Sequence, residues 1–161
     1  MKDIAVKPEP LSNAQEDVMF SRLMYMSGNV VTEVGLLLLV DRENKSLSDR
    51  QRECLVILAE ECGELVHAIC KTMRFGYHSN YENGTLAIDQ LMIEMADVLV
   101  ALEMKNDLEA ISINKYVYID ILSAIETVYM ELKVSKEDVT YLKDKKIAKL
   151  KKYTKYQDMH S

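Results

Sequence analysis

The chain has 161 residues, of which 48% are hydrophobic and 29% are charged, and it carries a formal net charge of −6 at pH 7. This length fits one domain with its own core, and this composition is ordinary for a folded soluble protein. Residues 141–161 hold seven lysines against two aspartates, so residues 1–140 carry a net charge of −11. An acidic body does not favour nucleic acid as a partner, although the basic end could contact phosphate.

The distribution of helix breakers predicts an all-α fold. The two prolines are Pro8 and Pro10, and the chain has only five glycines. Few breakers and long periodic segments favour helices. We expect a loose tail over residues 1–11, followed by a single helical domain over residues 12–161.

Five helices are expected in this domain, over about residues 13–41, 48–74, 86–105, 112–132 and 135–153. Capping-box patterns indicate three helix starts: Asn13 with Glu16, Ser48 with Gln51, and Ser135 with Asp138. Residues 75–84 are rich in turn formers and predict a loop.

Cysteine spacing and hydropathy favour a cytoplasmic protein. Cys54, Cys62 and Cys70 repeat every eight residues, about 12 Å apart along a helix, which is too far for a disulfide within it. Packed free thiols suit a reducing compartment. The longest uncharged apolar run near the start, Val34–Val40, is too short to span a membrane, and we expect no signal peptide and no membrane partner.

Two acidic pairs are the most informative feature. Glu61 and Glu64 lie three residues apart on one expected helix, as do Glu94 and Asp97 on the next, so each pair shares one helix surface. On a helical wheel Glu61 lies inside the apolar arc, about 60° from Leu58, whereas Glu64 lies at the edge of that arc.

The expected helix over residues 86–105 is apolar around almost its whole circumference. Its polar gap holds Gln90, Glu94 and Asp97, flanked by Ala87 and Ala101. Such a helix should be buried on most sides. Its acids then either form a thin solvated stripe or point into a polar site shared with Glu61. In the second case the carboxylates could share one or two hard cations, of which Mg²⁺ is the best match and Mn²⁺ a substitute.

The segment from Leu58 to Leu65, followed by Lys71, Arg74 and then Glu94-Met-Ala-Asp97, resembles the MazG-type all-α nucleoside triphosphate pyrophosphohydrolases. That superfamily also includes dimeric dUTPases and phosphoribosyl-ATP pyrophosphohydrolases, and its hallmark is Glu-x-x-Glu on one helix with Glu-x-x-Asp on the next. The likeness covers mainly residues 48–105. It implies a helical bundle completed by oligomerisation, as a homodimer or homotetramer.

The resemblance also implies a set of site residues and an activity. The reaction would be Mg²⁺-dependent hydrolysis of a nucleoside or deoxynucleoside triphosphate to the monophosphate and pyrophosphate. Glu61 or Glu64 would be the general base, with Glu61 preferred. The implied metal ligands are Glu61, Glu64, Glu94 and Asp97, and the implied phosphate contacts are Lys71, Arg74, Lys146 and Lys149.

Two other interpretations stay open. A di-iron carboxylate bundle needs two Glu-x-x-His motifs, and this chain offers one, Glu64 with His67. A non-enzymatic helical regulatory or interaction protein would have solvated or salt-bridged acids and a basic C-terminal helix. Stabilisation by nucleotides in the presence of Mg²⁺ would separate it from the enzyme.

Overall fold

The computed structural model describes residues 12–81, 84–104 and 115–153, and these form an all-α fold without strands. The only β-type pairing in this part of the chain is an isolated bridge between Asn80 and Leu86. The helices are α1 (Asn13–Asn44), α2 (Asp49–Phe75), α3 (Ala87–Glu103), α5 (Lys115–Glu131) and α6 (Lys136–Tyr153). The predicted class is therefore confirmed. The predicted tail, 1–11, and the predicted first residues of the fourth helix, 112–114, lie outside the described residues.

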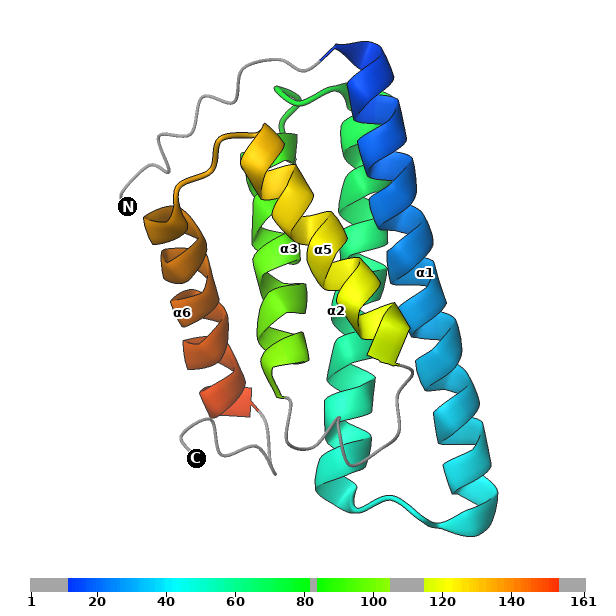
Figure 1. The fold of residues 1–161 in the computed structure, drawn as a ribbon. Helices are drawn as coiled ribbons and strands as arrows, with labels where there is room; N and C mark the ends of the chain where they lie inside the picture. The colour runs from blue at the N-terminus through cyan, green and yellow to red at the C-terminus, as the bar shows by residue number, and fades with distance from the viewer. Residues whose placement is uncertain (1–11, 82–83, 105–114, 154–161) are drawn as a thin grey trace.

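The helices pack around a central pair (Figure 1). α2 lies between α1 and α3, and α3 runs antiparallel to it after the connection over residues 76–86. α5 crosses against α1 and α3, and α6 packs against α3. Because α2 and α3 are direct neighbours, their acidic pairs can face each other.

The helix starts are set by side-chain caps, as the sequence predicts at two of three places. The Ser48 hydroxyl accepts from the Gln51 N–H (3.2 Å), and the Gln51 side chain accepts from the Ser48 N–H (2.9 Å). The Ser135 hydroxyl accepts from the Asp138 N–H at 3.1 Å.

The predicted cap of the first helix is wrong by one residue. Ser12 precedes the helix and donates its N–H to the Gln15 side chain at 3.2 Å, whereas Asn13 already lies inside the helix. Ser12 with Gln15 offers the same serine-to-glutamine spacing as Ser48 with Gln51, which is why it can serve equally well. α1 also continues three residues past its predicted end, to Asn44, and closes on Lys45 with positive φ.

The core is built mainly from α2 and α3. α3 is buried on nearly all sides, from Ala87 to Leu102, as its all-round apolar pattern predicts. Fully burying one of its Leu or Met side chains contributes roughly 1.5–3 kcal/mol. Cys54 and Cys62 are buried thiols, whereas Cys70 is exposed, so the expected thiol packing holds for two of the three.

α1 presents a second apolar face outward. The exposed side chains on it are Val18, Tyr25, Leu36, Leu39 and Val40. By length and composition, Asp17–Asn44 is the one described segment that could cross a membrane, with a mean hydropathy of 1.6 and 22% of its most apolar window buried in the bundle. The core helix of a soluble protein can be equally long and apolar. The expected absence of a membrane partner therefore stays a prediction.

Candidate metal centre

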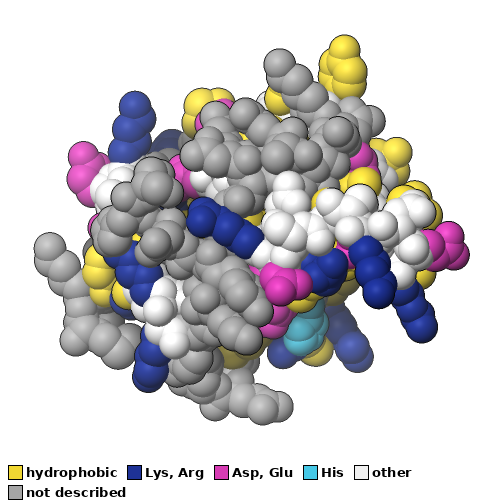
Figure 2. Space-filling view, turned by 90° about the horizontal axis from the view of Figure 1, so that it is seen from below, with side chains coloured by type: hydrophobic (Ala, Val, Ile, Leu, Met, Phe, Trp, Pro, Cys, Tyr) yellow, Lys and Arg dark blue, Asp and Glu magenta, His cyan; other side chains and the backbone are white. Residues whose placement is uncertain are grey.

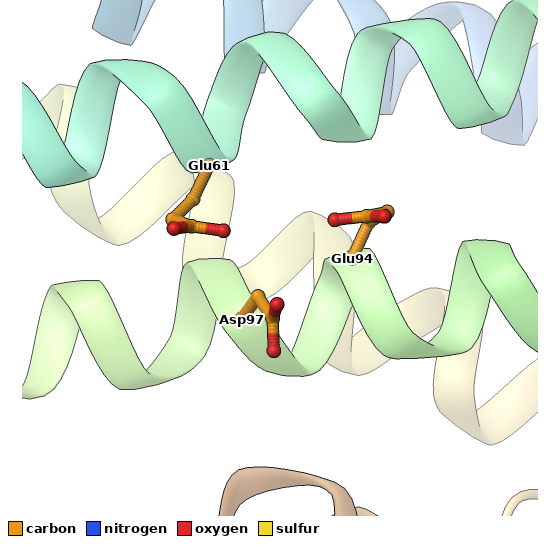
Figure 3. A group of neighbouring side chains, drawn as sticks. All are labelled: Glu61, Glu94 and Asp97. Carbon is orange, nitrogen blue, oxygen red and sulfur yellow. The ribbon is translucent and has the colours of Figure 1, made fainter. Parts of the chain in front are cut away.

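Three carboxylates meet between α2 and α3. Glu61 points from α2 toward α3, and Glu94 and Asp97 project from α3 (Figure 3). One oxygen of each lies within 4.8 Å of the others. The three residues are only 4%, 8% and 8% exposed. The acids of α3 therefore point into a polar site rather than forming a solvated stripe.

Helix geometry explains how the cluster forms. Glu94 and Asp97 are three residues apart and so lie one above the other on the same face of α3. Glu61 interrupts the apolar face of α2, between the buried Leu58 and Leu65, and that face is the one packed against α3. The apolar packing of the two helices thus forces the acids together.

A lysine from α6 enters the same cluster. Lys146 Nζ lies 2.7 Å from Glu61 Oε1 and 2.8 Å from Asp97 Oδ2, and its side chain is only 3% exposed. This ammonium group bridges α2 and α3, and it anchors α6 to both. Three carboxylates and one ammonium leave the fully ionised cluster with a net charge of −2.

Two fully buried oxygens of the cluster have no hydrogen-bond partner among the described residues. They are Oε2 of Glu61 and Oε2 of Glu94, both buried. The other oxygen of Glu94 accepts from the Gln90 side chain. A buried acceptor without a hydrogen bond is costly, and such atoms are rare in folded proteins. These two oxygens are therefore the open positions of the site.

Burial raises the pKa of every acid in the cluster. For Glu94 the pKa rises to about 7, because burial disfavours the charged form and the charges of Glu64, Asp97 and Glu61 add to this effect, while the bond from Gln90 opposes it. Burial also raises the pKa of Glu61 and of Asp97, although Lys146 partly offsets the rise in both. Ionising these buried acids is therefore costly, and a divalent cation bound between them would reduce that cost.

For Lys146 burial acts in the opposite sense and lowers the pKa. The hydrogen bonds to Asp97 and Glu61 outweigh it, so the pKa of Lys146 lies above its usual value. Lys146 is therefore a fixed positive charge inside the cluster at neutral pH.

The donor set fits a hard divalent cation. It consists of carboxylate oxygens alone, which suit Mg²⁺ and Mn²⁺ and give softer metals little advantage. His67 is exposed on α2 and is not part of the cluster. The two unpaired oxygens are available to a cation, whereas the two oxygens bound to Lys146 are already neutralised.

A cleft of about 590 Å³ opens beside the cluster, between α2 and α6. Glu61 and Lys146 line it on the side of the cluster. Val56, Ile57 and Leu150 give it an apolar wall, and its remaining lining residues are Asp49, Arg52, Glu53, Glu60 and Lys149. The cleft thus combines an apolar surface with charged groups of both signs.

The other predicted site residues lie outside the cluster. Glu64, expected as a fourth ligand, is exposed on α2, although its charge still raises the pKa of Glu94. Lys71 is half-buried, with its ammonium 4.3 Å from the centre of the Tyr81 ring. Arg74 is exposed, with its guanidinium 4.9 Å from the Phe75 ring centre.

Two further residues interact with the cluster: Tyr81, which sequence reasoning missed, and Gln90, which it placed in the polar gap without assigning it a role. Tyr81 lies under Lys71, and its buried hydroxyl has no hydrogen-bond partner in the described part of the chain. Burial raises the pKa of Tyr81, and the charge of Glu94 raises it further. Gln90 holds Glu94, and its position one turn before that acid was the available signal. Nothing in the spacing of the loop singled out Tyr81.

Comparisons of this chain with protein-family models, with curated proteins and with solved structures found no match. The paired acidic motifs and the geometry of the cluster are therefore the basis for assigning a function.

Proposed function

We propose that this protein hydrolyses a nucleoside or deoxynucleoside triphosphate to the monophosphate and pyrophosphate, with Mg²⁺ or Mn²⁺ as cofactor. The observation that carries the proposal is the buried cluster of Glu61, Glu94 and Asp97, in which two carboxylate oxygens lack a partner. Lys146 balances only one of the three carboxylate charges, so a ligand of opposite charge would offset the remaining cost of burying these acids. The MazG-like motif pattern supplies the reaction class.

Glu61, Glu94 and Asp97 would hold the cation, with Glu64 at the rim as a further acid. When bound, a divalent cation of this kind lowers the pKa of water and balances the charge of phosphate oxygens. Buried carboxylates with raised pKa values give up their protons more readily when a cation is near. The cluster should therefore bind a cation more tightly at or above neutral pH, where its carboxylates are ionised.

Lys146 and Lys149 lie on α6 beside the cleft and would contact the phosphates of the substrate. Lys71, ten residues and almost three helical turns beyond Glu61 on α2, would contribute a further positive charge, with Arg74 farther along. Of the two candidate bases, Glu61 stays our choice, because its Oε2 is buried at the cluster and unpaired, whereas Glu64 is exposed. A carboxylate in that position could accept the proton of an attacking water.

The outward apolar face of α1 supports assembly. Leu36, Leu39 and Val40 are more than half exposed near the end of that helix. A contiguous apolar face on a helix commonly meets another subunit. We propose a homodimer or homotetramer, in the cytoplasm, that completes a MazG-like bundle. Light scattering that gave the mass of a monomer would remove this part.

The activity is tested by a pyrophosphate-release screen over canonical, deoxy and modified triphosphates with Mg²⁺ or Mn²⁺. The wild-type protein should release pyrophosphate from at least one of them and stop when the metal is chelated. The test variant is Glu94→Gln, which keeps the shape of the side chain and an acceptor for Gln90 but removes the negative charge, and it should lose activity. Equal turnover by this variant and the wild type would overturn the proposal.

A second candidate is a non-enzymatic helical regulatory or interaction protein. The observation that favours it is the pairing of Lys146 with Glu61 and Asp97, since an ion-pair network of this kind can also serve only to join helices. On the face shown in Figure 2, basic side chains are spread with acidic ones between them. Under this alternative, nucleotides with Mg²⁺ would not raise the melting temperature.

A further inference from the structure

The ammonium of Lys146 occupies one carboxylate oxygen on each of two acids that would hold the cation, Glu61 and Asp97. We propose that Lys146 is an internal counter-ion that keeps divalent cations weakly bound until the phosphates of a nucleotide draw its ammonium away, so that metal and triphosphate bind together. The inference rests on the proposed function and concerns how that site is regulated.

The charges of the cluster make the competition direct. Lys146 Nζ contacts Glu61 Oε1 and Asp97 Oδ2, which belong to two of the three clustered acids. An ammonium ion and a divalent cation within a few ångströms repel each other strongly where water is scarce. A metal that binds while Lys146 stays in place must do so beside that ammonium, through the oxygens that it leaves open: Glu61 Oε2, Glu94 Oε2 and Asp97 Oδ1.

The surroundings of Lys146 give its side chain somewhere to go. It lines the cleft between α2 and α6 as well as contacting the cluster. α3 is the helix against which α6 mainly packs within the described residues, so the side of α6 that faces α2 is open. A lysine carries its ammonium on a flexible four-carbon side chain, so this group can move into the cleft without any movement of the helix.

An anion in the cleft supplies the replacement partner. Lys149 lies one turn beyond Lys146 and lines the same cleft. Phosphate oxygens held by Lys149 would accept the ammonium of Lys146. The ammonium then exchanges a carboxylate partner for a phosphate partner, and the acids become available to the divalent cation.

The test measures Mn²⁺ binding by electron paramagnetic resonance, without turnover. Wild type, Lys146→Met and the control Lys145→Met are titrated with Mn²⁺ alone and again with a non-hydrolysable triphosphate analogue. Lys145 is the adjacent, exposed lysine, so its variant removes the same charge from the surface. Lys146→Met should bind Mn²⁺ alone about tenfold more tightly than wild type, or more. Wild type and Lys145→Met should reach the Mn²⁺ affinity of Lys146→Met only when the analogue is present.

Each outcome decides a different question. If wild type binds Mn²⁺ alone as tightly as Lys146→Met, the counter-ion role is wrong and the metal site stands. If no form binds Mn²⁺ with or without the analogue, the proposed function itself fails. If Lys146→Met does not fold, the coupling between the two ligands is measured in the wild type instead. The analogue should then raise the affinity for Mn²⁺, and Mn²⁺ should raise the affinity for the analogue by the same factor. A factor near one overturns the proposal.

Discussion

Two buried acidic sites in this protein are built in opposite ways. Asp41, at the end of α1, is fully paired: its Oδ1 accepts from the Leu47 N–H at 2.6 Å, and its Oδ2 accepts from Arg52 Nε at 2.9 Å. The backbone bond from Leu47 and the charge of Arg52 hold the pKa of Asp41 below its usual value. In the cluster of Glu61, Glu94 and Asp97, burial raises every pKa instead, and two oxygens stay unpaired.

The contrast separates an acid that stabilises the fold from acids that cost it stability. Asp41 ties the turn between α1 and α2 to the first turn of α2 through Arg52, and its carboxylate has a structural purpose that needs no ligand. The cluster is fixed in place by the packing of α2 on α3, which would be served equally well by apolar side chains. This difference is the physical reason for assigning the cluster to a ligand.

The largest expected effect is on activity. Glu61→Gln and Asp97→Asn should each lower pyrophosphate release by about 100-fold or more, because each removes a charge from the proposed metal centre. Asp41→Asn removes a buried charge of the same kind from the structural site and should leave kcat/KM within a few-fold of wild type. Steady-state assays on the three variants check this. Unchanged turnover in both cluster variants would refute the mechanism.

The sign of the stability change should differ between the two sites. In metal-free protein at pH 8, Glu94→Gln should increase the free energy of unfolding by on the order of 2 kcal/mol, because a carboxylate with a folded-state pKa of about 7 is ionised there at a cost. Asp41→Asn should lower the melting temperature, since it breaks a paired carboxylate. Thermal melts in the presence of chelator measure both. A destabilised Glu94→Gln would mean that the charge of Glu94 supports the fold.

The pH dependence follows from the same shift. Glu94 has a usual pKa near 4.5 and a folded-state value of about 7, so between these values the folded state binds more protons than the unfolded chain. Its contribution to stability is therefore complete below about pH 4.5 and is lost as the pH rises through 7. Glu61 and Asp97 shift in the same direction. Urea unfolding at several pH values should show this decline in wild type and a smaller one in Glu94→Gln.

The smallest effect is expected at Lys71. Its ammonium lies over the Tyr81 ring and outside the cluster, so Lys71→Met should leave Mn²⁺ affinity unchanged. Loss of one phosphate contact should lower kcat/KM by about tenfold, mainly through KM. Kinetics on this variant beside a Mn²⁺ titration tests both statements. A loss of metal affinity would place Lys71 closer to the cation than the structure does.

Much of the fold could be predicted from the sequence because the signals are local. The all-round apolar pattern of α3 predicted that it is buried, and the cap at Ser48 predicted where α2 begins. The position of Glu61 inside an apolar arc predicted its burial, and the edge position of Glu64 agrees with its exposure. The cap at Ser12 was missed because two overlapping residue pairs had the same spacing.

The role of Lys146 could not be predicted from the sequence. It is one of several lysines on α6, and although its spacing of four residues from both Leu142 and Leu150 placed it on the apolar face of that helix, this spacing does not identify its partners. Its burial depends on how α6 packs against α3, which brings residues 49 positions apart into contact. Tyr81 is a similar case, since its place under Lys71 depends on the path of the loop.

The most direct test of the central claim is a crystal structure of the protein soaked with Mn²⁺ and a non-hydrolysable triphosphate, with the metal located by its anomalous scattering. The account predicts Mn²⁺ between the carboxylates of Glu61, Glu94 and Asp97, with the ammonium of Lys146 moved to a phosphate. Mn²⁺ bound elsewhere, with Lys146 still paired to Glu61 and Asp97, would contradict it.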